Sequence, residues 1–193
     1  MFKKLLILLL ILMLLSSCVV SRINTLDIIP NIHLPQCATS ALGIMVSINS
    51  ADQRSEKILA KLNRGGQCIA LMPSRDVRFL LQEIFEKQML ARGYTVGPNG
   101  PINLNIVIHK FYSDVREGNF SHSITTYADI AIIVQADNGH RKIKHFQSCH
   151  NVKGVFYATN NKIACAMSAI LNYVFNEISN DRSISDFIKQ NAY

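Results

Sequence analysis

The chain has 193 residues, of which 49% are hydrophobic, and this is enough for one domain with a core of its own. Its 20 lysine and arginine residues against 13 acidic residues give a formal net charge of +7, a modest positive excess. After residue 18 no apolar run reaches the roughly 18 residues of a membrane-spanning helix, which excludes a polytopic membrane protein. No repeat of fixed period and no low-complexity tract is present, which excludes a repeat protein.

The N-terminus has the pattern of a secretory signal. Two lysines precede an apolar run from Leu5 to Leu15, which is too short to remain across a bilayer. The Leu-Ser-Ser sequence before Cys18 resembles the lipobox of bacterial lipoproteins, so we expect cleavage after residue 17 and acyl chains on Cys18, which would hold the chain on a membrane. The alternative is an ordinary cleaved signal, with Cys18 at this position by chance.

The residue after the cysteine indicates the membrane in which the protein is located. In lipoproteins of this kind an aspartate there tends to retain the protein at the inner membrane, and here the residue is Val19. We therefore expect a lipid anchor in the outer membrane and a domain that faces the periplasm. That address makes nucleic acid a poor candidate partner and favours an envelope protein or an anionic envelope polymer.

The chain divides into a signal peptide (1–17), a lipidated tether with an edge strand (18–40) and a single domain (41–193). In the tether, apolar residues alternate from Leu26 to Leu34, and Pro30 restricts that strand to a sheet edge. The alternation returns from Leu42 to Ile48. Residues 49–64 fit a short helix only partly, and residues 67–72 fit the second arm of a hairpin.

Two helices and three long strands follow. Ser74 is a suitable N-cap for a helix that Gly93 ends, with a buried stripe through Leu81 that Phe79 widens. Alternating residues predict strands at 102–109, 124–134 and 141–156, joined by turns at 117–119 and 137–139. A second helix begins near Asn160, and a further turn of helix covers 183–190.

Each predicted helix has one apolar stripe, and the predicted sheet has one apolar face. The most economical arrangement is an α+β two-layer sandwich, in which two main helices pack on one face of an antiparallel sheet. The other face of the sheet is polar enough to meet water or a partner.

Five segments carry a resemblance to a known family, namely 50–54, 75–83, 91–101, 128–133 and 187–192. In these segments the chain resembles the YajG family of bacterial lipoproteins, and the resemblance extends over nearly the whole chain. It implies an outer-membrane lipoprotein of Gram-negative bacteria whose gene lies near that of a muropeptide permease. It implies no catalytic or binding residues.

The sequence has no recognisable catalytic motif and indicates no cofactor. His140, His145, His150 and Cys149 suggest a metal at first, but on a strand His145 and Cys149 would stand about 13 Å apart, so we predict no metal site. Four further cysteines, Cys37, Cys68, Cys149 and Cys165, allow disulfides in an oxidising compartment, although none is needed, and we expect one disulfide or none. Cys68 and Cys165 lie in apolar sequence and are expected in the core.

Two surface features are candidate binding sites. Asp52 and Arg54 follow a predicted strand and form either a binding loop or, as we favour, a local ion pair. The strand after the Asn-Gly turn carries a basic group, Arg141, Lys142 and Lys144, with no acid among them. These residues either contact an anionic partner or, as we favour, guard an edge strand against sheet-to-sheet aggregation.

The sequence therefore predicts a non-enzymatic envelope protein, a tethered module for binding or assembly. The first alternative is a hydrolase of muropeptide fragments, suggested only by the gene neighbourhood. The second is a carrier of a lipid or small ligand in a pocket between sheet and helices.

Overall fold

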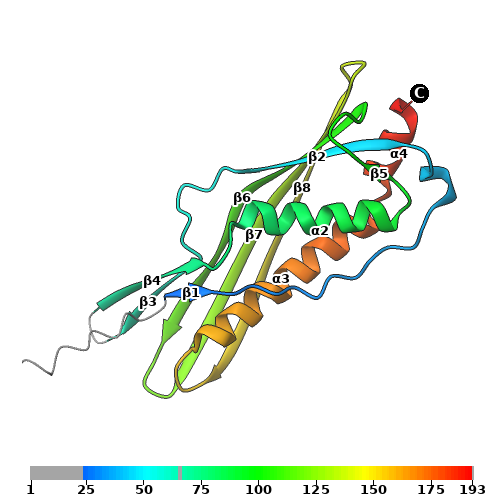
Figure 1. The fold of residues 1–193 in the computed structure, drawn as a ribbon. Helices are drawn as coiled ribbons and strands as arrows, with labels where there is room; N and C mark the ends of the chain where they lie inside the picture. The colour runs from blue at the N-terminus through cyan, green and yellow to red at the C-terminus, as the bar shows by residue number, and fades with distance from the viewer. Residues whose placement is uncertain (1–23, 65–66, 193) are drawn as a thin grey trace, which may run out of the picture.

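The computed structural model describes residues 24–64 and 67–192. The expected signal peptide and Cys18 lie outside the described residues. Within them, an eight-stranded sheet forms one layer and two long helices form the other, so the α+β sandwich is confirmed (Figure 1).

The three longest strands of the sheet form an antiparallel meander. These are β6 (Ile102–Glu117), β7 (Ser121–Ala136) and β8 (Arg141–Val155), of which β8 lies at the sheet edge, and their turns lie where the sequence places them. The β6–β7 register shifts between Ile108 and Lys110, so that His109 is an extra residue without a partner on β7. Before this bulge the even-numbered residues of β6 face the helices, and after it the odd-numbered residues do.

The remaining strands make the sheet mixed rather than purely antiparallel. β2 (Met45–Asp52) runs parallel to β6 and to the short β5 (Thr95–Val96). β3 (Ala60–Arg64) and β4 (Gln67–Pro73) form the expected hairpin, which joins β6 through β3 in parallel. The parallel pairing of β2 with β6 follows from the helix between them, because a helical crossover returns the chain in the same direction.

The tether contributes less strand than expected. β1 comprises only Thr25–Leu26 and pairs in parallel with the end of β4. The chain then continues without strand pairing to a short 3₁₀ turn, η1 (Thr39–Ala41). Leu26 and Ile28 are nevertheless buried in the main core, whereas Leu34 is exposed. Pro30 and Pro35 lie within this unpaired stretch, and proline cannot donate to a strand ladder.

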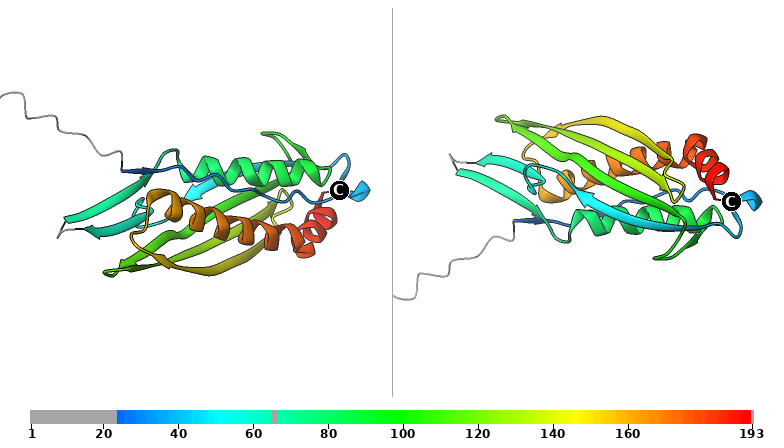
Figure 2. Two further views of the ribbon diagram at one scale, coloured as in Figure 1. Left: turned by 90° about the horizontal axis from the view of Figure 1, so that it is seen from below. Right: turned by 90° about the horizontal axis from the view of Figure 1, so that it is seen from above.

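Helices α2 (Val77–Ala91) and α3 (Asn160–Asn180) cover one face of the sheet, and α4 (Arg182–Asn191) continues from α3 (Figures 1 and 2). Asp76, not Ser74, caps α2, because its carboxylate accepts the amide of Arg78. Phe79 is 61% exposed and does not widen the buried stripe of the helix as expected.

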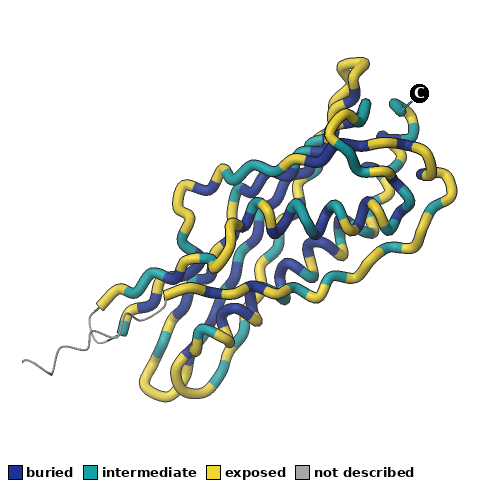
Figure 3. The backbone as a smooth tube through the Cα atoms, in the orientation of Figure 1, coloured by how far each residue is buried: buried dark blue, intermediate teal, exposed yellow. Residues whose placement is uncertain are grey.

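The core lies between the sheet and the helices, as the band of buried backbone in Figure 3 shows. The inward residues of β7 are all buried, as their alternation predicts: Ile124, Thr126, Ala128, Ile130, Ile132 and Val134. Leu81 of α2 is fully buried in the same core. The C-terminal ends of the helices are joined by Arg92, a buried side chain that donates to the carbonyls of Ile178 (3.0 Å) and Ser179 and to the Ser185 hydroxyl (2.6 Å).

The molecule is elongated, and its two ends differ. The start of β1, the far end of the β3–β4 hairpin and the β6–β7 turn lie at one end, and the C-terminus lies at the other (Figures 1 and 2). All four cysteines in the described part of the chain are free and exposed, so the expectation that Cys68 and Cys165 are core residues is wrong. Apolar neighbours in sequence do not decide the face on which a side chain lies. That face is set by the alternation of side chains along a strand and by the turn of the helix.

Candidate functional site

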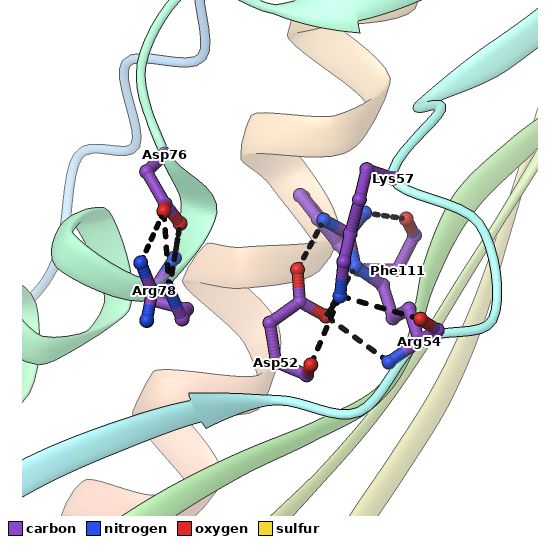
Figure 4. Close-up of polar contacts among 6 residues, drawn as sticks. All are labelled: Asp52, Arg54, Lys57, Asp76, Arg78 and Phe111. Atoms are coloured by element: carbon purple, nitrogen blue, oxygen red, sulfur yellow. Dashed lines mark hydrogen bonds and ion pairs between the residues drawn. The ribbon is translucent and has the colours of Figure 1, made fainter.

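Asp52 and Arg54 form a buried ion pair at the end of β2. The Arg54 guanidinium donates from Nε to Oδ1 (3.0 Å) and from Nη2 to Oδ2 (2.8 Å), and the Arg54 amide also donates to Oδ1 (3.1 Å) (Figure 4). Its Nη1 donates to the Phe111 carbonyl on β6 (3.0 Å). The two side chains are only 5% and 6% exposed. This is the local ion pair expected from the sequence, and it also fixes the chain after β2 to the middle of β6.

The charge of Asp52 is stabilised where it lies. Burial alone would raise the pKa of this carboxyl, but hydrogen bonds from Arg54 and from Lys57, whose Nζ lies 3.1 Å from Oδ1, lower its pKa to about 2. Asp52 is therefore ionised at neutral pH, with its oxygens already occupied by donors. Such a carboxylate is poorly suited to act as a general acid or base near pH 7.

The same Asp-x-Arg arrangement occurs a second time at the start of α2. Asp76 accepts the amide of Arg78 (2.9 Å) and pairs with its guanidinium at 2.7 Å, although these side chains are 39% and 41% exposed. The hydrogen bond from Arg78 lowers the pKa of Asp76. This second pair was not predicted as a site from the sequence, although the same Asp-x-Arg spacing occurs in two of the segments that carry the family resemblance.

The structure brings the two Asp-x-Arg pairs to opposite sides of one cavity, as Figure 4 shows. This cavity, here called the polar groove, has a volume of about 610 Å³ and is lined by both pairs, by Lys57 and by the last residues of β2 and β4. Lys57, half exposed, and Arg78 present cationic groups at its mouth. Residues 24 positions apart thus contribute to one charged surface.

A second cavity of about 450 Å³, here called the tyrosine groove, lies between residues 54–61 and the middle of β6. Tyr112 and Tyr127 line it with their rings stacked at a centroid distance of 5.1 Å, and Tyr112 is 42% exposed. Lys61, paired with Glu56 at 2.7 Å, also lines it. Arg54 lines both grooves, so the buried ion pair forms a wall that they share.

The basic residues of β8 lie elsewhere. β8 pairs only with β7, so two strands separate it from β2 and the Asp52–Arg54 pair. The register places Lys142 and Lys144 on the helix side and Arg141 on the open side of the sheet. Lys144 forms an ion pair with Asp181 at 2.9 Å, which leaves Arg141 and Lys142 as the more available charges. The structure therefore does not combine the two candidate sites from the sequence.

The histidines of β8 do not converge on a metal. His145 stacks on His109 at 5.7 Å, while His140 contacts Asn191 of α4 at 2.7 Å. Across residues 24–64 and 67–192, no group of three or more potential ligands lies close enough to hold an ion. None of the helices in these two ranges has the length and hydropathy to cross a bilayer.

Comparison with known proteins identifies relatives. A family model described as uncharacterized lipoprotein matches residues 30–189. The uncharacterized lipoprotein YajG of Escherichia coli is 49% identical over 192 residues, which covers 100% of both chains, and the protein from a second strain of that species matches to the same extent. A crystal structure of protein XCC0632 from Xanthomonas campestris shares the fold with a TM-score of 0.59, over 80% of this chain and 91% of that one, at 10% identity.

Proposed function

Because this chain belongs to the family of uncharacterised lipoproteins that includes YajG, we propose that it is a non-enzymatic binding module, tethered to the bacterial outer membrane and facing the periplasm. Cys18 would carry the acyl chains, since it follows the signal at the lipobox position. Two or more acyl chains hold a protein on a bilayer stably, whereas one gives only marginal binding. Val19 after the cysteine supports the outer membrane as the address.

The observation that carries the binding role is the pair of grooves on either side of Arg54. A recognition site combines concave shape with a few fixed polar groups, and the buried Asp52–Arg54 pair provides a rigid wall for both cavities. Lys57 and Arg78 would meet anionic or carbonyl groups of a partner, and Tyr112 would supply an exposed aromatic surface.

The chemistry of the grooves supports binding rather than catalysis. Their carboxylates are engaged by arginine or lysine, and the pKa of Asp52, about 2, lies far from neutral pH. We propose an envelope protein or an anionic envelope polymer as the partner. The tyrosine groove favours a second candidate function, a carrier of a small ligand, because its volume suits a compact molecule with an aromatic or sugar face.

Photo-crosslinking in intact envelopes tests the proposal. A photoreactive phenylalanine analogue replaces Tyr112 in one variant and Tyr173 in another; Tyr173 is a control on α3 that is more exposed than Tyr112, at 54% against 42%. We expect a defined adduct from position 112, weakened by Arg78→Glu, and no such adduct from position 173. The same adducts from both positions would argue against a binding face at the grooves, and a small-molecule adduct would favour the carrier.

A further inference from the structure

Four large apolar side chains are exposed together at one end of the molecule. Phe120 is in the β6–β7 turn, and Val155, Phe156 and Tyr157 lie where β8 leads to α3; these side chains are 63–78% exposed. The Phe156 amide donates to the Phe120 carbonyl at 3.0 Å, so the two segments are in contact. We call this group the apolar end. Water-facing aromatic residues gathered in this way indicate an interaction surface.

The backbone holds Phe156 in an unfavourable conformation with its ring outward. Its φ is 60°, in the left-handed region that a bulky residue rarely occupies. The Phe156 carbonyl lies 2.7 Å from Nδ1 of His122, a buried side chain. Gly154 makes room for that ring, because a Cβ there would lie 2.5 Å from it. These contacts fix the position of Phe156 and leave its side chain to the solvent.

Arg64 ties the apolar end to the β3–β4 hairpin. Its guanidinium forms two hydrogen bonds with Glu117, at 2.8 and 3.0 Å, and another with the Ala158 carbonyl. It also lies 5.9 Å from the centre of the Tyr157 ring. Glu117 in turn accepts the Ala158 amide at 2.8 Å. These hydrogen bonds link the apolar end to β3 through Arg64 and to β6 through Glu117.

The charges around the apolar end are mainly positive. Lys153 and Lys162 are exposed, and Arg116 has an 84% exposed side chain. The acids nearby are already engaged, Glu117 by Arg64 and Asp114 by Arg116. Exposed aromatic residues with flanking lysines are the composition that favours the interface of an anionic bilayer.

The start of the described chain lies at this same end (Figures 1 and 2). Asn24 lies six positions after Cys18, and a segment of that length spans at most about 20 Å. An acyl group on Cys18 would therefore keep this end of the molecule close to the bilayer.

We propose that the apolar end inserts into the headgroup region of the phospholipid bilayer and acts as a second membrane contact beside the acyl anchor. This inference rests on the acylation of Cys18 in the proposed function. The contact orients the long axis of the molecule away from the membrane and exposes the C-terminal end to the periplasm.

The test uses the absence of tryptophan from the chain. Phe120→Trp places a single reporter at the apolar end, and Leu42→Trp places one at the other end of the molecule, where Leu42 lies beside Gly93 after α2. Each full-length variant is purified in its processed form and reconstituted in phosphatidylethanolamine–phosphatidylglycerol vesicles whose acyl chains are brominated. The mass of the N-terminal peptide reports the acylation of Cys18 separately.

We expect bromolipid to quench the tryptophan at position 120 and leave the one at position 42 unquenched. Adding Phe156→Ser to the Phe120→Trp variant should reduce the quenching without changing the circular dichroism spectrum. Acylated protein with equal, low quenching at both positions would overturn the inference and leave the anchor intact. Protection of position 120 from iodide without bromolipid quenching would instead indicate a second copy or another protein there, and would also overturn it. An N-terminal peptide without acyl mass would refute the anchor and, with it, this inference.

Discussion

Asp52→Asn should destabilise the protein by an amount that depends on pH. The pKa of Asp52 is about 2 in the fold against an ordinary aspartate value of 3.8, and a difference of that size corresponds to about 2 kcal/mol of stability at pH 7. Because the folded pKa is lowered, this contribution is complete above the unfolded pKa and declines as the pH falls through the folded pKa. It should be about 1 kcal/mol at pH 3 and near zero below pH 2.

Asp76→Asn is the matched control, since it alters the same Asp-x-Arg geometry at an exposed pair and asparagine remains a good N-cap. Its effect should stay below about 1 kcal/mol at either pH. Urea unfolding of the domain without its signal, at pH 7 and pH 3, measures both variants. Equal losses for Asp52→Asn at the two pH values would refute the reasoning, because the loss would then come from packing and not from the charge.

Three further predictions concern the core, the helix junction and the basic strand. Leu81→Ala should lower the free energy of unfolding by about 2–5 kcal/mol in urea, because the side chain is fully buried between α2 and the sheet, and a loss under about 0.5 kcal/mol would contradict that packing. Arg92→Lys should cost about 2–3 kcal/mol in the same assay, since one ammonium cannot serve the acceptors on α3 and α4 together; an unchanged midpoint would mean that those hydrogen bonds contribute little. If Arg141 and Lys142 bind an anionic partner, reversing both charges should lower the recovery of that partner from envelope extract at low salt. The difference should be smaller at physiological salt, where charges are screened beyond about 8–10 Å. Equal recovery by wild type and variant at both salt concentrations would mean that these residues only protect the edge strand from aggregation.

Much of the fold could be predicted because its signals are local. The alternation in β7 and the turn at 137–139 are properties of a few adjacent residues, and the structure has both where the sequence indicates them. The pairing of β2 with β6 could not be predicted in this way, because alternation shows which face a residue takes but not which strand lies beside it. The expected antiparallel sheet is therefore mixed.

The candidate site was predictable only in part, for the same reason. The spacing of Asp52 and Arg54 indicated a local pair, which the structure confirms. Its position opposite Asp76 and Arg78 depends on how α2 is placed after the β3–β4 hairpin, and this is a tertiary property. The aromatic stack of the tyrosine groove likewise requires the β6–β7 register, since the two residues are far apart in sequence.

The bulge in β6 also determines how this strand can change in length. His109 has no partner on β7, so its removal would leave a regular ladder with Ile108 and Phe111 still facing the helices. Removal of a paired residue such as Asn105 would instead turn every side chain between the deletion and the bulge to the opposite face, and would bring polar groups into the core. Among homologous chains, a one-residue gap at position 109 is therefore compatible with the same core. A gap within the regular part of the ladder would destabilise the fold.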